Sequence, residues 1–156
     1  MKALIVIDMQ EDYTGQKRNQ KRYPYDSMQL IKSINARITN YEQHTNSVIY
    51  IKNKGKSAQI SALVEGLNVV SDLCFTKEKA SCFSNPEFIS YLIENNLSQL
   101  ELAGVDGNYC VGMSAIDGAK KGFDIHISLS CVGIVNDDKF QTTKEKMLKA
   151  GVQIYD

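Results

Sequence analysis

The 156-residue sequence lacks tryptophan, has only two prolines and two histidines, and contains no long apolar run. A membrane-spanning helix needs about 18 or more consecutive apolar residues, so we expect no membrane-embedded segment. Two prolines and ten glycines leave little room for linkers or low-complexity tracts. The length suits one domain, which we expect to span residues 1–156.

The sequence also lacks an excess of either charge. Eighteen Lys and Arg residues balance eighteen Asp and Glu residues. Nucleic-acid grooves and polybasic membrane surfaces need excess positive charge, so we expect neither partner. The apolar run at residues 3–7 is too short for a signal peptide, so we expect a cytoplasmic protein whose four cysteines are thiols.

Apolar periodicity predicts alternating strands and helices. Strands are expected at 4–7, 48–51, 73–76, 100–103, 125–131 and 152–155, and helices at 27–41, 86–93, 109–121 and around a capping-box pattern at 142–145. Residues 9–25 are expected to form a loop, and 53–70 to hold at most one short helix. This alternation predicts a three-layer α/β fold with a doubly wound, mostly parallel sheet of about six strands.

In such a sheet the functional site lies outside the carboxyl ends of the strands, which directs attention to Asp8, Lys52, Lys77 and the turn at 104–110. The turn after the first strand is acidic and carries neither the dinucleotide fingerprint nor a P-loop. We therefore expect no nucleotide and no other cofactor.

The two histidines do not form a metal-binding pattern. His44 and His126 are best explained as partly exposed side chains, with His126 as a catalytic base the weaker alternative. The remaining candidates are Asp8, Lys77 and Cys110, although a cap, a solvated lysine and a buried cysteine would also explain them individually. Cys110 starts a predicted helix, where peptide dipoles favour a thiolate.

Three segments at 6–13, 77–83 and 104–111 together resemble the isochorismatase-like cysteine hydrolase superfamily, which includes nicotinamidases and N-carbamoyl amide hydrolases. They read VIDMQEDY, KEKASCF and GVDGNYCV, and the resemblance spans residues 4–132. It implies a catalytic triad of Asp8, Lys77 and Cys110. It also implies a cis peptide bond before Asp106, an oxyanion hole made by the backbone N–H groups of Asp106 and Cys110, and a homo-oligomer such as a dimer or tetramer.

The chemistry of these residue types agrees with that resemblance. A nucleophilic thiol needs a group to take its proton and a cation to stabilise its anion. Asp8 can accept the proton and later return it to a leaving amine, while Lys77 can hold both anions together. Such a triad needs no histidine.

The sequence also departs from the family pattern. Gly107 replaces a usual threonine, Asp106 replaces a small residue, and Cys82 replaces an alanine. Residues 50–55 hold no histidine or acid where nicotinamidases of the family carry a metal cluster, so we expect no metal site. Cys110 argues against the vinyl-ether cleavage of the isochorismate branch.

These observations predict a metal-free cysteine hydrolase that cleaves a C–N bond, amide or carbamoyl, of a small molecule through a thioester. Tyr13, Phe83 and Tyr109 are expected to line the pocket, with core packing as the alternative for each, and Gln10 to orient Asp8. Cys74, Cys82 and Cys131 are expected to be packing residues. A family member that keeps the fold for binding or assembly, or a redox-active thiol protein, remains an alternative function.

Overall fold

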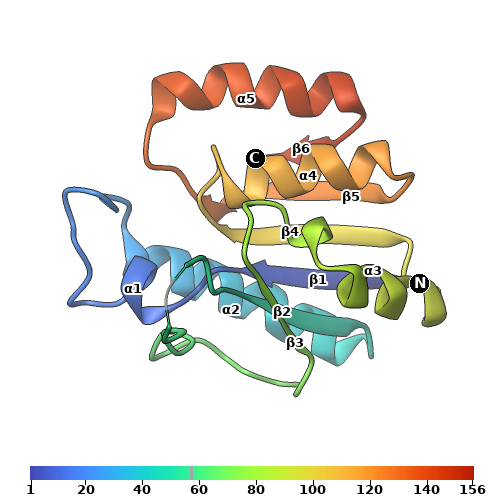
Figure 1. Cartoon of the computed structure of the whole chain (residues 1–156), viewed down its shortest axis with the longest axis horizontal. Coiled ribbons are helices and arrows are strands. Elements are labelled where there is room, and N and C mark those ends of the chain that lie inside the picture. The colour runs from blue at the N-terminus through green and yellow to red at the C-terminus, as the bar shows by residue number, and fades with distance from the viewer. Residues whose placement is uncertain (57) are drawn as a thin grey trace.

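The computed structural model describes residues 1–56 and 58–156, and a six-stranded sheet forms its centre (Figure 1). The strand order is β3-β2-β1-β4-β5-β6, and every neighbouring pair is parallel. The strands are β1 Lys2–Ile7, β2 Ser47–Asn53, β3 Cys74–Lys77, β4 Gln99–Val105, β5 Asp124–Gly133 and β6 Gln153–Tyr155. The predicted α/β fold is confirmed, with a sheet that is wholly parallel.

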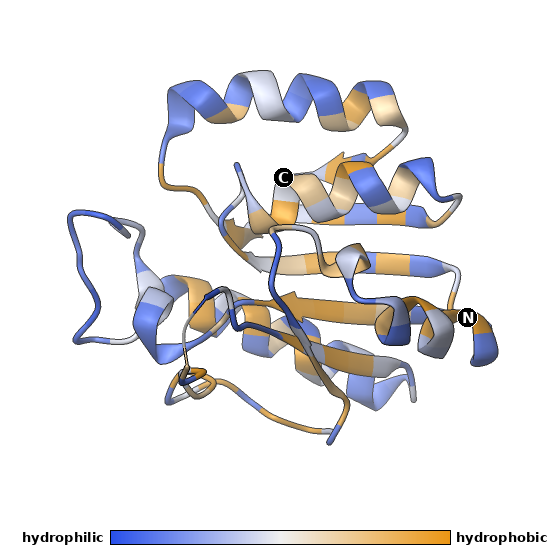
Figure 2. Ribbon diagram, in the orientation of Figure 1, coloured by the Kyte–Doolittle hydropathy of each residue, from blue (hydrophilic) through white to orange (hydrophobic). Residues whose placement is uncertain are grey.

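Helices cover both faces of the sheet, because alternate residues of the central strand point to opposite sides. Leu4 and Val6 pack in the core under α2 (Ser27–Gln43), while Ala3, Ile5 and Ile7 belong to the second core. That second core is covered by α3 (Pro86–Glu94), α4 (Cys110–Lys120) and α5 (Asp137–Ala150). Figure 2 shows β1 as hydrophobic along most of its length, as a strand buried on both faces must be.

The helix ends follow the capping chemistry of the sequence. Asp26 caps α2 by accepting a hydrogen bond from the backbone N–H of Gln29, 3.1 Å away. Asn85 caps α3 in the same way, with Pro86 in the first turn. Gly122, just past α4, has a φ of 95°, the left-handed conformation expected of a glycine at that place.

The capping-box pattern lies within the last helix, α5, as predicted, and Asn136 caps that helix by accepting a hydrogen bond from the N–H of Lys139. Other local predictions differ from the structure. One helical turn, α1 (Glu11–Thr14), interrupts the predicted loop at 9–25. The described residues between β2 and β3 hold no helix, and a single antiparallel bridge ties Leu63 to Gln10.

A second short element, the 3-10 turn Cys82–Ser84, follows β3. Cys82 and Cys131 are buried as expected, but Cys74 is exposed at the start of edge strand β3. The prediction that Cys74 is a packing residue is therefore wrong.

Strand β4 passes unusually close to β1 at its carboxyl end. Gly104 has a φ of 121°, and a Cβ atom there would lie 1.9 Å from the carbonyl oxygen of Ile7. Only glycine permits this approach. The turn that follows β4 therefore lies directly beside the end of β1. None of the helices among the described residues has the length and apolar character needed to cross a membrane.

Candidate active site

Asp8 is held rigidly where β1 ends. Its φ is 55°, a left-handed conformation that aspartate adopts more readily than most residues. Its backbone N–H donates to the carbonyl oxygen of Ile51 at 2.9 Å, which ties the turn to β2. The residue is only 2% exposed, so its carboxyl group lies below the surface.

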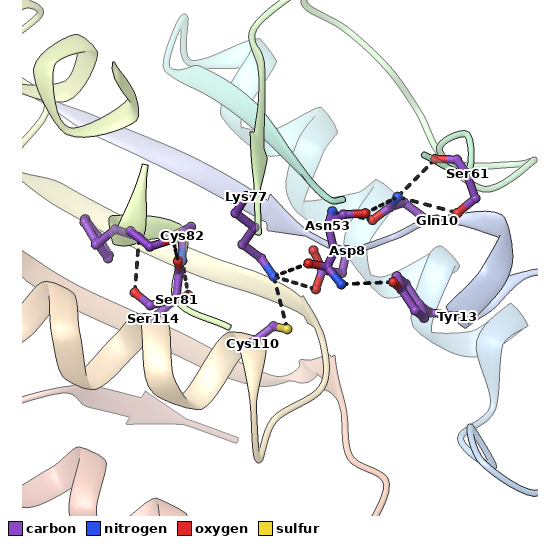
Figure 3. Close-up of polar contacts among 12 residues, drawn as sticks. Asp8, Gln10, Tyr13, Asn53, Ser61, Lys77, Ser81, Cys82, Cys110 and Ser114 are labelled. Carbon is purple, nitrogen blue, oxygen red and sulfur yellow. Dashed lines mark hydrogen bonds and ion pairs between the residues drawn. The ribbon is translucent and has the colours of Figure 1, made fainter. Parts of the chain in front are cut away.

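Lys77 links Asp8 to Cys110 (Figure 3). It is the last residue of β3 and is 2% exposed. Its Nζ donates to Asp8 Oδ2 at 3.1 Å and to Cys110 Sγ at 3.2 Å. Cys110 is the first residue of α4, so three separate elements bring these side chains together. Asp8, Lys77 and Cys110 thus meet at the carboxyl ends of the strands, where the sequence predicts the site.

The charges of the three groups depend on one another. Burial and the carboxylate of Asp8 raise the pKa of Cys110 to about 12, although Lys77 opposes this. Burial also raises the pKa of Asp8, against the opposing effect of Lys77. Burial alone would lower the pKa of Lys77, but Asp8 and Cys110 together raise it. At neutral pH Lys77 is therefore an ammonium ion and Cys110 a thiol.

The raised pKa of Cys110 contradicts the thiolate that the sequence predicts. The position of Cys110 at a helix N-terminus predicts a thiolate. Burial and the neighbouring Asp8 carboxylate outweigh the helix dipole, so the proton stays on sulfur until a base removes it. Asp8 is the acidic side chain that interacts with Cys110.

The turn between β4 and α4 forms the wall beside Cys110. The Val105–Asp106 peptide bond is cis, as the family resemblance implies. Asp106 Oδ1 accepts hydrogen bonds from the backbone N–H groups of Asn108 and Val135, both at 3.2 Å, so this carboxyl group organises the turn. The N–H of Cys110, at the first helical position, has no acceptor within its helix.

Packing explains why glycine occupies position 107. A Cβ atom there would lie 3.0 Å from side-chain carbons of Ile134 and Phe140, and 3.1 Å from Val132. Such contacts are tighter than ordinary van der Waals contact, and a threonine would add two more heavy atoms. The departure from the family pattern at Gly107 follows from these three apolar neighbours.

A cavity of about 700 Å³ opens above Asp8 and Cys110. Tyr13 and Tyr109, two of the predicted pocket residues, are among the residues that line it. Asp106 lines it as well, together with Cys110.

Phe83 does not line this cavity, so its predicted pocket role is wrong, and the side chain of Gln10 does not bind Asp8, which it was predicted to orient. Phe83 is 4% exposed and packs against Phe88, and its ring fills the space left by Gly118, where a Cβ would come within 2.6 Å. Gln10 is fully buried, and its amide binds the backbone of Asn53 and Ser61 rather than Asp8.

Asn53 is a site residue that the sequence did not indicate. It ends β2 and lines the cavity. Its Oδ1 lies 3.5 Å from Lys77 Nζ, and its Nδ2 donates to the hydroxyl oxygen of Tyr13 at 3.0 Å. The only sign in the sequence was that Asn53 follows a predicted strand, whose carboxyl end was expected to lie at the same edge of the sheet as Asp8.

Tyr23 and Tyr25 also line the cavity, from the segment predicted only as a loop. Arg18 holds this loop through three hydrogen bonds, in which its guanidinium donates to the carbonyl oxygens of Gly15, Tyr23 and Tyr25 at 2.8–3.1 Å. The hydroxyl of Tyr25 donates to the carbonyl oxygen of Tyr13. One side of the cavity is therefore an ordered aromatic wall.

The two histidines stand apart from the site. His44 caps the end of α2, and His126 lies near the start of β5, where it stacks on Tyr155 and contacts Asp124. Neither lines the cavity as the structure describes it. The catalytic-base alternative for His126 has no geometric support.

Solved structures share this fold over nearly their whole lengths. A pyrazinamidase of Pyrococcus horikoshii in complex with zinc has a TM-score of 0.84 and 20% identity, covering 98% of this chain and 97% of that one. A nicotinamidase from Bacillus subtilis has a TM-score of 0.80 and 19% identity, with 99% of both chains covered. N-carbamoylsarcosine amidase from Thermoplasma acidophilum has a TM-score of 0.80 and 17% identity, covering 99% and 96%.

The zinc in the first of these structures prompts a test of this site. Protein zinc sites are built from Cys, His and carboxylate ligands. Within residues 1–56 and 58–156, no three such side chains gather closely enough to hold a metal ion. Asp8, a carboxyl group in the cavity lining, is bound to Lys77. Lys54 and Lys56 also line the cavity, and their positive charges would repel a metal ion. The residues present do not fit a zinc ion.

The sequence itself also matches a known protein family. A search of curated proteins finds no match. The family model described as the isochorismatase domain matches residues 2–156. Because that match covers practically the whole sequence, and the fold agrees with it, the chain belongs to the isochorismatase family of hydrolases.

Proposed function

We propose that this hydrolase is a cysteine amidohydrolase that cleaves the C–N bond of a small amide or carbamoyl compound. One observation carries the proposal: Lys77 Nζ lies 3.1 Å from Asp8 Oδ2 and 3.2 Å from Cys110 Sγ. A nucleophile, a base and a cation thus meet beneath a cavity that can hold a small molecule.

The first half of the reaction forms an acyl-enzyme. As Cys110 Sγ attacks the carbonyl carbon, its proton passes to the carboxylate of Asp8. Lys77 stabilises the negative charge on sulfur during this transfer. The carbonyl oxygen becomes an oxyanion, which the backbone N–H groups of Asp106 and Cys110 bind. One such donor typically contributes about 3–4 kcal/mol to the stability of the transition state.

Collapse of this intermediate breaks the C–N bond. Asp8 returns its proton to the leaving nitrogen, so ammonia or an amine departs and a thioester remains on Cys110. A water molecule then gives a proton to Asp8 and attacks the thioester carbon. The C–S bond breaks, the acid leaves, and Sγ recovers the proton from Asp8. The sum is one amide and one water converted to one acid and one amine.

The similar structures support this reaction class. Pyrazinamidase, nicotinamidase and N-carbamoylsarcosine amidase are all named for C–N bond cleavage. Their identities with this chain are 20% or less, so the chemical argument rests on its own three residues. No step requires a metal ion or a cofactor.

The test is ammonia release from a panel of small amides, ureas and carbamoyl compounds. Turnover should be lost in Cys110→Ala and in Lys77→Met, and it should persist in Cys74→Ala, which removes an exposed thiol outside the cavity. Intact-mass analysis of the wild-type protein during turnover should show an added acyl group. Activity retained in Cys110→Ala would disprove the nucleophile, and a panel with no turnover would favour the non-catalytic alternative.

A further inference from the structure

We propose that the substrate carries an anionic group, such as a carboxylate, which Arg22, Lys54 and Lys56 bind at the mouth of the active-site cavity. This inference rests on the proposed function and adds the substrate class to it. It makes these three residues determinants of specificity.

The three cations come from two separate loops that meet at the cavity. Arg22 lies on the loop between α1 and α2, and Lys54 and Lys56 follow β2; all three line the cavity. In Figure 1 both loops lie beyond the carboxyl ends of the strands, on the side of the site. A substrate whose scissile carbon reaches Cys110 therefore extends between them.

The positive charges are largely uncompensated. Arg22 and Lys56 form no ion pair with any residue the structure describes. Lys54 lies 3.9 Å from Glu78, and the two side chains are 46% and 71% exposed, which makes this a weak pair. All three cations thus have donors free for a ligand, although the whole chain has no net charge.

The acids of the cavity do not cancel this charge. Asp8 is bound by Lys77. Asp106 accepts two backbone N–H groups, and it lies within electrostatic reach of Lys139. The field at the mouth is therefore positive, and a cleft lined by one sign of charge concentrates ligands of the opposite sign.

The aromatic wall also supports an anion site. The Arg22 guanidinium lies over the ring of Tyr23, 5.5 Å from its centroid, which orients it beside the cavity. Arg18 fixes the position of Tyr23 through its carbonyl oxygen. A guanidinium held in this way can bind a carboxylate through two parallel hydrogen bonds.

The test uses small probes of similar length that carry different charges remote from the scissile bond. Succinamate, pentanamide and 4-aminobutanamide form an anionic, neutral and cationic set of amides, and N-carbamoylglycine and propylurea form a matched carbamoyl pair. Ammonia release should give a kcat/KM for the anionic probe about tenfold or more above that of its neutral partner. This ratio should fall as salt is raised from about 0.02 M to about 0.3 M, because exposed charges are screened.

Substitutions show whether the three cations cause the preference for anionic probes. The triple variant Arg22→Gln, Lys54→Gln, Lys56→Gln should lower the anionic-to-neutral ratio about tenfold, chiefly through KM, because the contacts are remote from the reacting atoms. Glu78→Gln should raise the ratio, since it frees Lys54. Lys149→Ala removes one exposed cation in the last turn of α5 and should leave the ratio unchanged.

Failure of this inference differs from failure of the proposed function. Equal turnover of anionic and neutral probes, or a ratio unaffected by the triple variant, would overturn the anion site while the hydrolase stands. If no probe is hydrolysed, calorimetry with Cys110→Ser protein decides the matter. Tighter binding of succinamate than of pentanamide, weakened in the triple variant, supports the anion site; equal or absent binding refutes it.

Discussion

Gln10 Oε1 accepts a 2.7 Å hydrogen bond from the backbone N–H of Asn53 and thereby joins the turn after β1 to the end of β2. The same side chain donates from Nε2 to the carbonyl oxygen of Ser61 at 3.0 Å. Gln10 is fully buried, and its two partners are partly exposed. Asp8 and Asn53, which flank this contact, both lie within reach of Lys77.

Gln10→Leu should therefore destabilise the protein by about 1–3 kcal/mol, because it removes the hydrogen bonds from a buried amide to the backbone of Asn53 and Ser61. It should also lower kcat through displacement of Asn53. Urea denaturation measures the first effect and steady-state kinetics the second. Gln43→Leu, at an exposed position in α2, is the matched control. A stability equal to that of the wild type would show that the bonds at Gln10 contribute little.

Removal of the Asp8 charge should make Cys110 more reactive in the resting protein. The carboxylate adds to burial in raising the pKa of Cys110 to about 12. Asp8→Asn removes that anion, so the pKa falls and more thiolate is present at pH 8. Iodoacetamide should then modify Cys110 several-fold faster than in the wild type, although turnover is lost. Peptide mass spectrometry separates Cys110 from exposed Cys74, and an unchanged rate at Cys110 would contradict the coupling.

The acid side of the pH–activity profile should reflect Asp8. Burial raises its pKa above the ordinary aspartate value of about 3.9, and only the carboxylate can accept the thiol proton. As pH falls through this raised pKa, kcat/KM should decline with a midpoint above about 4. Asp138→Asn, an exposed change in α5, should leave the profile as it is. A midpoint at or below the ordinary value would remove Asp8 as the base.

Threonine at position 107 should destabilise this protein even though it is usual in the family. Its side chain would overlap Phe140, Ile134 and Val132, and overpacking of this kind typically costs about 1–3 kcal/mol. Gly107→Ala should cost less. Phe140→Leu should reduce the cost of Gly107→Thr in a double-mutant cycle, because it removes part of the obstructing ring. Additive losses by thermal or urea denaturation would argue against a direct clash.

The proximity of the three proposed catalytic residues was predictable because each lies where regular structure begins or ends. Asp8 and Lys77 end strands, and Cys110 starts a helix, so topology alone brings them to one edge of the sheet. Their charge states were not predictable. The helix position of Cys110 is visible in the sequence, but its burial beside Asp8 is a tertiary property that reverses the expected shift in pKa.

The pocket walls were only partly predictable. Tyr109 and Phe83 both neighbour motif residues, yet Tyr109 is 52% exposed and Phe83 lies in the core. The difference arises from Gly118, whose missing side chain gives the Phe83 ring its space. Tyr25 reaches the cavity from an irregular segment that has no periodic pattern to interpret. Asn53 is the last residue of β2, two residues beyond the predicted end of that strand.

The hydrogen bonds from Arg18 to three carbonyl oxygens affect which positions of the loop can vary in evolution. A single side chain supplies much of the framework of the loop that presents Tyr23 and Tyr25. Exposed neighbours in that loop, such as Gln20 and Lys21, are free to vary without moving the rings. The loop therefore offers exposed positions where the sequence can change while the cavity wall and the ends of the strands stay as they are.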